Sequence, residues 1–322
     1  MNLNKKSWQW ALLIVLSFIW GASFILMKKG LRSYSPDQVA AMRIFISFLV
    51  LLPFMIPRIK LIDRTNIRPL LIAGFIGNGI PAFLFATAQT RVDSSVAGML
   101  NSLTPLFTLL VGLLLYRTGT RLLNVIGVII GLIGAFGLIG HPDPSLIPEN
   151  TPWYSEACIL FSAYGRSVSK LFDTGNAYAL LIVLATLFYG INVNEVKSRL
   201  YNLDGITITA LLFLFIGPFA GVYLLFTDFH AAFATENYGL NFMYIFILAF
   251  FGSAVAVIGI NALIRHASAL FASSVTYVIP VFAITWGLID GESVTLISIA
   301  SMGIIFLGVY LVNKNGRRTR AM

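Results

Sequence analysis

The chain has 322 residues, of which 58% are hydrophobic and 11% are charged, and its mean hydropathy is +0.86. This composition excludes a soluble globular protein, because too little polar surface remains to cover a globule of that size. The formal net charge of +9 comes from lysines and arginines placed mainly between apolar stretches, so it indicates membrane topology, and no nucleic-acid partner is expected.

Ten apolar stretches are long enough to cross the hydrocarbon core of a bilayer as helices, which takes about 20 residues each. In chain order they are 9–28, 38–57, 69–90, 94–116, 121–140, 178–197, 206–227, 241–264, 269–290 and 294–313. They are continuously apolar rather than alternating, which favours helices over the strands of a barrel. The sequence therefore predicts an all-α integral membrane protein with ten transmembrane helices.

The chain carries the same pattern twice, with five apolar stretches in each copy. In each of two regions, a constant shift along the sequence matches residues of the first half with residues of the second. The matched pairs include Pro105 with Pro280, Gly112 with Gly287, Trp20 with Tyr189, Gly21 with Gly190 and Lys28 with Lys197. An odd number of spans per copy places the second copy upside down in the membrane. We therefore expect two inverted five-helix repeats, at 1–140 and 178–322, joined by a linker at 141–177.

Positive charges set the orientation, because loops rich in lysine and arginine stay on the cytoplasmic side. With the N-terminus inside, 15 of the 22 lysines and arginines fall on the inner side, and the last of them form a basic tail. Both termini are therefore predicted to be cytoplasmic in a multi-pass protein of the cell membrane, with the linker outside. After Pro152 the linker has the three-to-four spacing of an amphipathic helix, which could rest on the membrane surface or act as a lid.

Polar side chains inside the apolar stretches are the best guide to a substrate path, because each must find a partner or face water. Symmetry-related positions near the interface of two inverted repeats are where a transporter places its site. The candidate substrate-binding residues are Trp20, Arg43, Asn78, Asn101, Tyr189, Asn192, Asn261, Thr276 and Tyr277. Each of them could instead be a hydrogen-bond partner between helices.

Two charged residues inside the stretches allow more specific interpretations. Arg43 suits a carboxylate on a substrate, although it could also reach the outer interface or pair with Asp37. Glu195 is the only acidic residue within a stretch apart from Asp290, the last residue of its own stretch, and protonation of Glu195 could couple transport to a proton gradient. The alternative for Glu195 is a structural ion pair with the neighbouring Lys197 or Arg199.

Two equivalent prolines interrupt helical hydrogen bonding. Pro105 and Pro280 each free a backbone carbonyl one turn earlier, near Asn101 and Thr276. These carbonyls could line the substrate path, and the prolines could be hinges or static kinks. Hinges are the functional prediction that we carry forward.

Several features in this order resemble the drug/metabolite transporter superfamily, and within it the EamA-type group with ten helices. They are Trp20-Gly21, Pro36 before Arg43, Asn101-Ser-Leu-Thr-Pro105, Thr276-Tyr-Val-Ile-Pro280 and Gly291-Glu292. The resemblance covers nearly the whole chain and implies a basket-like bundle with a central cavity that exports amino acids or other small metabolites, often by exchange or proton coupling. Two features depart from the group: Arg117 stands where its members commonly have glutamate, and the linker is long.

Catalysis has little support in the sequence. The only cysteine is Cys158, and the three histidines lack metal-ligand spacing, so we expect no enzyme, metal or cofactor. The sequence predicts a secondary transporter that exports small polar metabolites such as amino acids, with a lipid bilayer and a proton or counter-substrate as its other partners. A broad-specificity exporter of drugs or cations and a non-transporting scaffold subunit are the alternatives, and the oligomeric state is left open.

Overall fold

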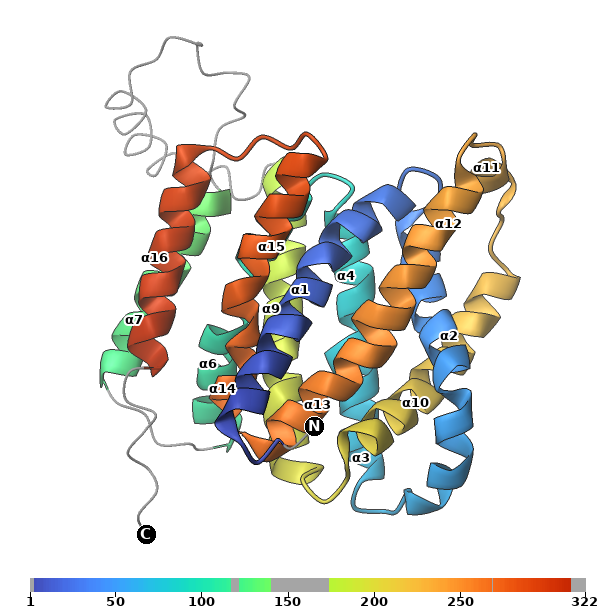
Figure 1. Cartoon of the computed structure of the whole chain (residues 1–322), viewed down its shortest axis with the longest axis horizontal. Coiled ribbons are helices and arrows are strands. Elements are labelled where there is room, and N and C mark those ends of the chain that lie inside the picture. Colours follow the sequence, from blue (N-terminus) through green and yellow to red (C-terminus); the bar gives the residue numbers. More distant parts are fainter. Residues whose placement is uncertain (1–2, 117–121, 140–173, 268, 314–322) are drawn as a thin grey trace.

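The computed structural model describes residues 3–116, 122–139, 174–267 and 269–313, which form one bundle of helices (Figure 1). Among these residues, eight helices are long and apolar enough to cross a membrane, and shorter apolar helical segments lie at Leu122–Ala135 and Ser298–Gly308. The described part of the chain is therefore all helical, and the chain is a multi-pass membrane protein. The predicted linker helix and the basic tail lie outside the described residues, apart from residues 174–177 of the linker.

The elements follow one another in the same order in the two halves. The first half contains α1 (Lys6–Gly30), α2 (Pro36–Met55), the 3₁₀ segment η1 (Ile56–Leu61), α3 (Ile67–Leu71), the π-helical segment η2 (Ile72–Gly79), α4 (Ile80–Ala88), α5 (Ser94–Asn101), α6 (Thr104–Tyr116) and α7 (Leu122–Ile139). The second half contains α9 (Thr174–Arg199), α10 (Gly205–Leu225), α11 (His230–Phe233), α12 (Tyr238–Ile247), the π-helical segment η4 (Leu248–Val255), α13 (Ala256–His266), α14 (Ala269–Ser273), α15 (Val275–Ile289) and α16 (Leu296–Asn313).

Side-chain caps begin the second helix of each half. The Ser35 hydroxyl accepts a hydrogen bond from the Gln38 amide at 3.3 Å, and the Asp204 carboxylate accepts one from the Thr207 amide at 2.7 Å. Serine and aspartate are favoured at this position because they satisfy amides that the first turn leaves free. The local sequence therefore fixes where α2 and α10 start.

Helices of the two halves pack against one another across the bundle. α1 packs on α15 and α9 on α6, while α2 packs on α10 and α7 on α16, at opposite edges of the view in Figure 1. A Cβ on Gly190 of α9 would lie 2.8 Å from the carbonyl carbon of Phe107 in α6, and one on Gly21 of α1 would lie 3.2 Å from the carbonyl oxygen of Ile279 in α15. The repeated glycine thus permits the same close crossing in each half.

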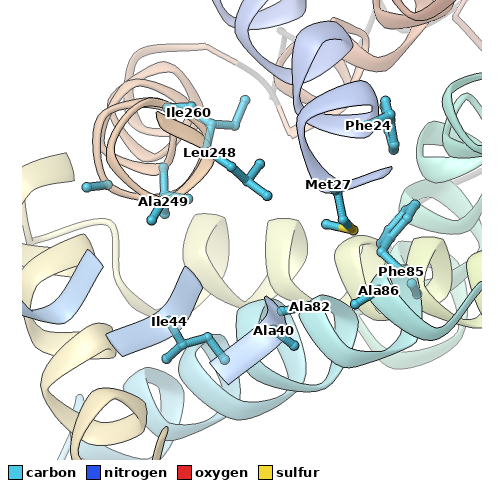
Figure 2. Close-up of a cluster of buried hydrophobic side chains, with 14 of the residues drawn as sticks. Phe24, Met27, Ala40, Ile44, Ala82, Phe85, Ala86, Leu248, Ala249 and Ile260 are labelled. Atoms are coloured by element: carbon cyan, nitrogen blue, oxygen red, sulfur yellow. The ribbon is translucent and has the colours of Figure 1, made fainter. Parts of the chain in front are cut away.

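The apolar core beside the centre of the bundle is built from alanines, larger aliphatic side chains and a few aromatic rings. Figure 2 shows Phe24 and Met27 of α1 pointing toward Phe85 and Ala86 of α4, and all four are buried. The rings of Phe24 and Phe85 lie 5.7 Å apart, in the range where aromatic pairs attract. This packing forms one side of the cavity that holds the candidate site.

Candidate functional site

A cavity of about 110 Å³ lies in the centre of the bundle, between helices of both halves. A single water needs about 10–15 Å³ of such space, so the cavity has room for a small organic molecule. The first half contributes Trp20, Ser23, Phe24, Met27, Arg43, Gly77, Asn78, Phe85, Asn101 and Thr104. The second half contributes Tyr189, Asn192, Val193, Gly252, Val257, Ile260, Ile264, Ala272, Ser273, Val275 and Thr276.

The cavity brings together seven of the nine residues that the sequence marked as substrate-binding. They are Trp20, Arg43, Asn78, Asn101, Tyr189, Asn192 and Thr276. Asn261 is buried away from the cavity, where its Nδ2 donates to the hydroxyl of Thr209 at 3.0 Å and ties α13 to α10. Tyr277 is half-buried, packs against the apolar core and does not line the cavity.

Arg43 places a guanidinium group on the cavity wall. Its Nε donates to the hydroxyl of Ser253 in η4 at 2.5 Å, so α2 of the first half meets the second half here. Among the described residues no carboxylate lies within ion-pair distance of Arg43, and Asp37 is no exception. A charge inside a membrane protein is expensive unless it is paired or faces a polar ligand or water. Arg43 therefore has bonding capacity left for an anionic group in the cavity.

Two amide oxygens on the wall are also without partners. The Oδ1 atoms of Asn101 and Asn192 are buried and make no hydrogen bond within the described part of the chain. Leaving such an acceptor unsatisfied costs about 1–3 kcal/mol, so each oxygen is a favourable place for a donor from a ligand. Together with Arg43, they give the cavity both donors and acceptors.

The two π-helical segments shape the wall. In η2 the Asn78 Nδ2 donates to the carbonyl of Ala73 at 2.8 Å, and the indole of Trp20 donates to the carbonyl of Gly252 in η4 at 2.8 Å. π-helical turns leave backbone groups displaced from the regular ladder and are often found at functional sites. These two contacts use such carbonyls to hold Asn78 and Trp20 at the cavity.

Glycines in the same segments make room for polar side chains of the other half. A Cβ on Gly77 would overlap the side chain of Asn192, lying 2.7 Å from its Cβ, and a Cβ on Gly252 would lie 2.7 Å from the hydroxyl oxygen of Ser23. Ser23 and Asn192 occupy equivalent positions in α1 and α9, three residues after Trp20 and Tyr189. The absence of a side chain at Gly77 and Gly252 therefore leaves the space that Asn192 and Ser23 occupy.

One wall of the cavity is aromatic. The rings of Phe85 and Tyr189 are stacked, with centroids 5.9 Å apart and an interplanar angle of 20°. Sequence reasoning found Tyr189 but missed Phe85, because a phenylalanine in an apolar stretch does not differ in pattern from one that faces lipid. The only signal was spacing, since Phe85 lies seven residues, about two helical turns, after Asn78.

Both proline-freed carbonyls already accept hydrogen bonds. Pro105 is the second residue of α6, and the Asn101 carbonyl accepts from the Thr104 hydroxyl at 2.8 Å. Pro280 lies inside α15, and the Thr276 carbonyl accepts from the Ser102 hydroxyl at 3.2 Å. The helix is broken before Pro105 but continuous through Pro280. Hinge motion at either proline stays a prediction.

Glu195 lies outside the cavity. It accepts a hydrogen bond from the Tyr116 hydroxyl and pairs with Arg199 at 3.3 Å. Lys197 does not pair with it, because its Nζ donates to the carbonyls of Ile264 at 2.8 Å and Ala267 at 2.5 Å. The contacts of Glu195 thus match the structural alternative, and its role in proton coupling stays a prediction. No group of three His, Cys, Asp or Glu within the described ranges could hold a metal ion.

A helical bundle that crosses a membrane many times and holds a cavity lined by both apolar and polar side chains is the architecture of a carrier for small molecules. The chain belongs to the EamA-like transporter family, whose pattern matches residues 8–140 and 176–314. It is therefore a transporter of the drug/metabolite type, as the sequence resemblance indicated.

Proteins with similar sequences carry transporter names. The chain is 27% identical over 308 residues to the uncharacterized inner membrane transporter YedA of Escherichia coli K12, an alignment that covers 93% of this chain and 89% of YedA. It is 26% identical over 174 residues, 53% of this chain and 54% of the relative, to a Salmonella typhimurium protein named "Probable amino-acid metabolite efflux pump". One crystal structure shares the fold with a TM-score of 0.63 at 14% identity, over 98% of this chain and 100% of that one.

Proposed function

We propose that the protein is a secondary transporter that exports small polar metabolites such as amino acids by alternating access between two inverted repeats. The observation that carries the proposal is the cavity between the halves, where the Arg43 guanidinium has no carboxylate partner and two amide oxygens are unpaired. A carboxylate suits Arg43, and an ammonium group suits the oxygens of Asn101 and Asn192. The family name and the efflux-pump name of one relative agree with this chemistry.

Four features support the inverted repeats, at 1–140 and 178–322 with the linker between them. The contacts between the halves are symmetric. α1 packs on α15, and the equivalent helices of the opposite halves, α9 and α6, pack on each other in the same way. Each third span contains a π-helical segment, and each fourth span is broken, between α5 and α6 and between α14 and α15. The family pattern also matches the chain in two stretches. With ten helices the second half is inverted, both termini lie in the cytoplasm, and the protein resides in the cell membrane.

The mechanism requires the two halves to move against each other around the cavity. Pro105 and Pro280 are proposed as hinges beside the breaks that carry Asn101 and Thr276. Glu195 is the candidate for proton coupling, and a counter-substrate is the other way to drive export. No step in this cycle uses a metal or a cofactor.

A second candidate is a broad-specificity exporter of cations or drugs. The aromatic wall of Trp20, Phe85 and Tyr189 favours it, because aromatic rings attract cations. The positive charge of Arg43 in the same cavity opposes it. Substrate charge therefore distinguishes the two candidates.

The test is counterflow in proteoliposomes that contain the purified protein. Labelled neutral amino acids and labelled organic cations are offered separately, with and without an imposed pH gradient. Asn101→Ala and Thr276→Ala are compared with the control Thr285→Ala, whose side chain is exposed on α15. We expect saturable amino-acid flux in the wild type and the control, and loss of flux in the two cavity variants with unchanged thermal unfolding.

Other outcomes would contradict the proposal. Saturable flux of cations alone would favour the second candidate. If no compound is carried by protein shown to be folded and inserted, and the cavity variants lose only stability, the protein is a scaffold subunit rather than a transporter.

A further inference from the structure

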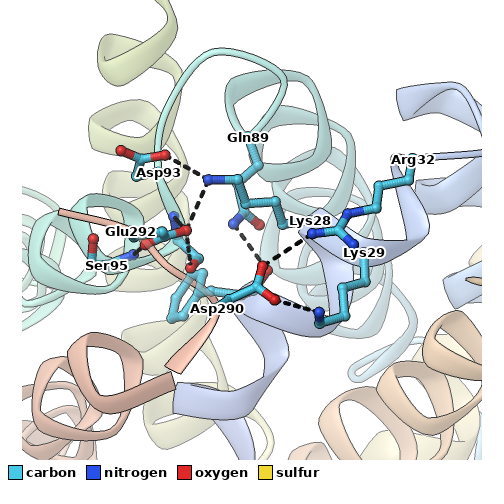
Figure 3. Close-up of polar contacts among 10 residues, drawn as sticks. Lys28, Lys29, Arg32, Gln89, Asp93, Ser95, Asp290 and Glu292 are labelled. Atoms are coloured by element: carbon cyan, nitrogen blue, oxygen red, sulfur yellow. Dashed lines mark hydrogen bonds and ion pairs between the residues drawn. The ribbon is translucent and has the colours of Figure 1, made fainter. Parts of the chain in front are cut away.

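Six charged side chains meet at one end of the bundle, the upper end of α1 in Figure 1. They are Lys28, Lys29, Arg32, Asp93, Asp290 and Glu292, and we call this group the ionic latch (Figure 3). The cations come from the end of α1, Asp93 from the loop before α5, and the other two acids from the loop after α15. The latch therefore joins three parts of the chain from both halves.

Lys28 is the link between the acids. Its Nζ lies 2.5 Å from Asp93 Oδ1 and 2.8 Å from Glu292 Oε1. Asp290 bonds to Lys29, and Arg32 Nη2 lies 3.2 Å from its other carboxylate oxygen. Four of the five ion pairs among the described residues belong to this group.

Glu292 also caps a helix of the other half. Its carboxylate accepts hydrogen bonds from the Ser94 amide at 2.9 Å, the Ser94 hydroxyl at 2.6 Å and the Ser95 amide at 3.0 Å. Asp93, which precedes α5, makes no capping bond of its own. Gly291 turns the chain with a φ of 88°, a conformation that favours glycine, and brings Glu292 back toward α5. A carboxylate at a helix N-terminus is favourable because the free amides and the helix dipole attract it.

The capping carboxylate is almost enclosed, with a side chain 4% exposed. Burial acts to raise the pKa of Glu292, but hydrogen bonds from Lys28, Ser94 and the Ser95 amide outweigh it and lower the pKa from 4.5 to about 2. A carboxyl with a lowered pKa stabilises the folded contacts above pH 4.5 and loses that contribution only as the pH falls toward 2. Glu292 therefore stays charged throughout the physiological pH range.

We infer that the ionic latch is a gate that closes the cavity at this end and must separate for the cavity to open there. The three latched elements each carry cavity residues: Trp20 lies on α1, Asn101 ends α5, and Thr276 lies near the start of α15. Separating Glu292 from Lys28 and from the first turn of α5 frees these elements to move apart. The inference rests on the proposed alternating-access function, and it adds the residues that hold one closed state.

The experiment measures whether breaking the latch exposes the cavity. Met27, the residue before Lys28 in α1, lines the cavity and is 2% exposed. In a Cys158→Ser background, Met27→Cys is labelled with a membrane-impermeant maleimide in right-side-out and in inside-out vesicles. The labelling rate is compared in the presence of Glu292→Gln, Asp290→Asn and the control Asp63→Asn, which neutralises an exposed carboxylate in the loop before α3.

We expect Glu292→Gln to raise the labelling rate about tenfold or more, from the latch side only, since losing a charge-assisted bond shifts a two-state population by about that factor. Asp290→Asn, which leaves the α5 cap intact, should give a smaller increase, and Asp63→Asn none. The ratio of the Glu292→Gln rate to the wild-type rate should be the same from about pH 5 to pH 8, because Glu292 does not titrate there and the pH dependence of the thiol itself cancels in the ratio.

Three results would overturn the inference. They are an unchanged rate in both latch variants, an equal rise in the Asp63→Asn control, or a rise from the opposite side of the membrane. Labelling needs no substrate, so it is read independently of flux. If the proposed function is wrong, the wild type shows no flux, and if the latch is wrong, only the labelling rates fail to change.

Thermal unfolding of each variant shows that it is folded, and Asp290→Asn keeps the test valid if Glu292→Gln does not fold.

Discussion

The two halves of the molecule repeat the backbone but differ in the side chains that carry chemistry. The N-caps of α2 and α10 are equivalent, Ser35 in one and Asp204 in the other, and both hold an amide three residues on. Arg43 lies eight residues after the cap Ser35, and the residue eight positions after the cap Asp204 is Leu212. Leu212 of α10 is therefore the equivalent of Arg43 of α2. The cationic group of the cavity thus exists in one half only.

The same contrast separates the two ends of the cavity. Lys28 at the end of α1 bonds to two carboxylates, whereas its equivalent Lys197 in α9 bonds to backbone carbonyls at the end of α13. The contacts at one end of the bundle are therefore ion pairs, and those at the other are chiefly with the backbone. Equivalent helices can move in equivalent ways, while the side chains at each end and on each wall of the cavity differ. Such a difference is required in a transporter that carries its substrate in one direction.

Replacing Arg43 by leucine, the residue at the equivalent position of the second half, should have the largest effect on transport. In Arg43→Leu the carboxylate of a substrate loses its charged partner, and hydrogen bonds to charged groups contribute about 1.5–3 kcal/mol. We expect half-saturation for amino acids to rise by about 10- to 100-fold, or flux to disappear, while amines without a carboxylate are unaffected. Counterflow over a concentration series measures this.

Arg43→Lys is the matched variant, because it keeps the charge but loses the planar guanidinium. It should recover part of the affinity. Equal transport of carboxylates by wild type and Arg43→Leu would remove Arg43 from the substrate site.

Substituting alanine for either of the matched glycines Gly77 and Gly252 should have a smaller effect, and one that differs between the two. In Gly77→Ala the added methyl group overlaps the body of the Asn192 side chain, and overpacking of this kind costs about 1–3 kcal/mol. In Gly252→Ala the methyl group would lie 2.7 Å from the hydroxyl oxygen of Ser23 and 3.2 Å from Cδ1 of Leu248, which are both ends of rotatable side chains. The higher helix propensity of alanine also recovers about 1 kcal/mol.

Thermal unfolding in detergent and counterflow measure the difference between the two glycine variants. We expect Gly77→Ala to lower both stability and substrate affinity, because Asn192 is displaced, and Gly252→Ala to change either only slightly. A larger loss of stability and substrate affinity in Gly252→Ala than in Gly77→Ala would show that Ser23, rather than Asn192, is the side chain on which the cavity depends more.

Much of the helical framework could be predicted because it follows from composition and spacing. Apolar stretches of membrane-spanning length gave the helices, and the match between Trp20 and Tyr189 pointed to residues that the structure brings to one cavity. Polar residues in apolar helices were good candidates because a buried polar group needs a partner. The same rule explains the miss at Asn261, whose partner is Thr209 rather than the cavity.

Other parts depend on contacts between distant segments, which one sequence does not contain. The bonds between Glu292 and α5 join residues about 200 positions apart, and nothing near Ser94 reveals that its cap comes from the other half. The π-helical segments were also missed, because Gly77 and Gly252 stand out in the sequence only as residues matched between the two copies. The side chains that pack against them, Asn192 and Ser23, come from distant segments of the chain.

The smallest effect is expected at the end opposite the latch, where Glu195 contacts Tyr116 and Arg199 outside the cavity. The Arg199 side chain is 57% exposed, and ion pairs of this kind contribute about 0–1 kcal/mol. In Glu195→Gln the amide oxygen can still accept from Tyr116, so we expect nearly unchanged stability and counterflow. Gradient-driven flux measured beside counterflow decides the point. If the variant keeps counterflow but loses the response to the gradient, Glu195 carries the coupled proton, and the end of the bundle where Lys197 bonds to backbone carbonyls is also the end that senses protons.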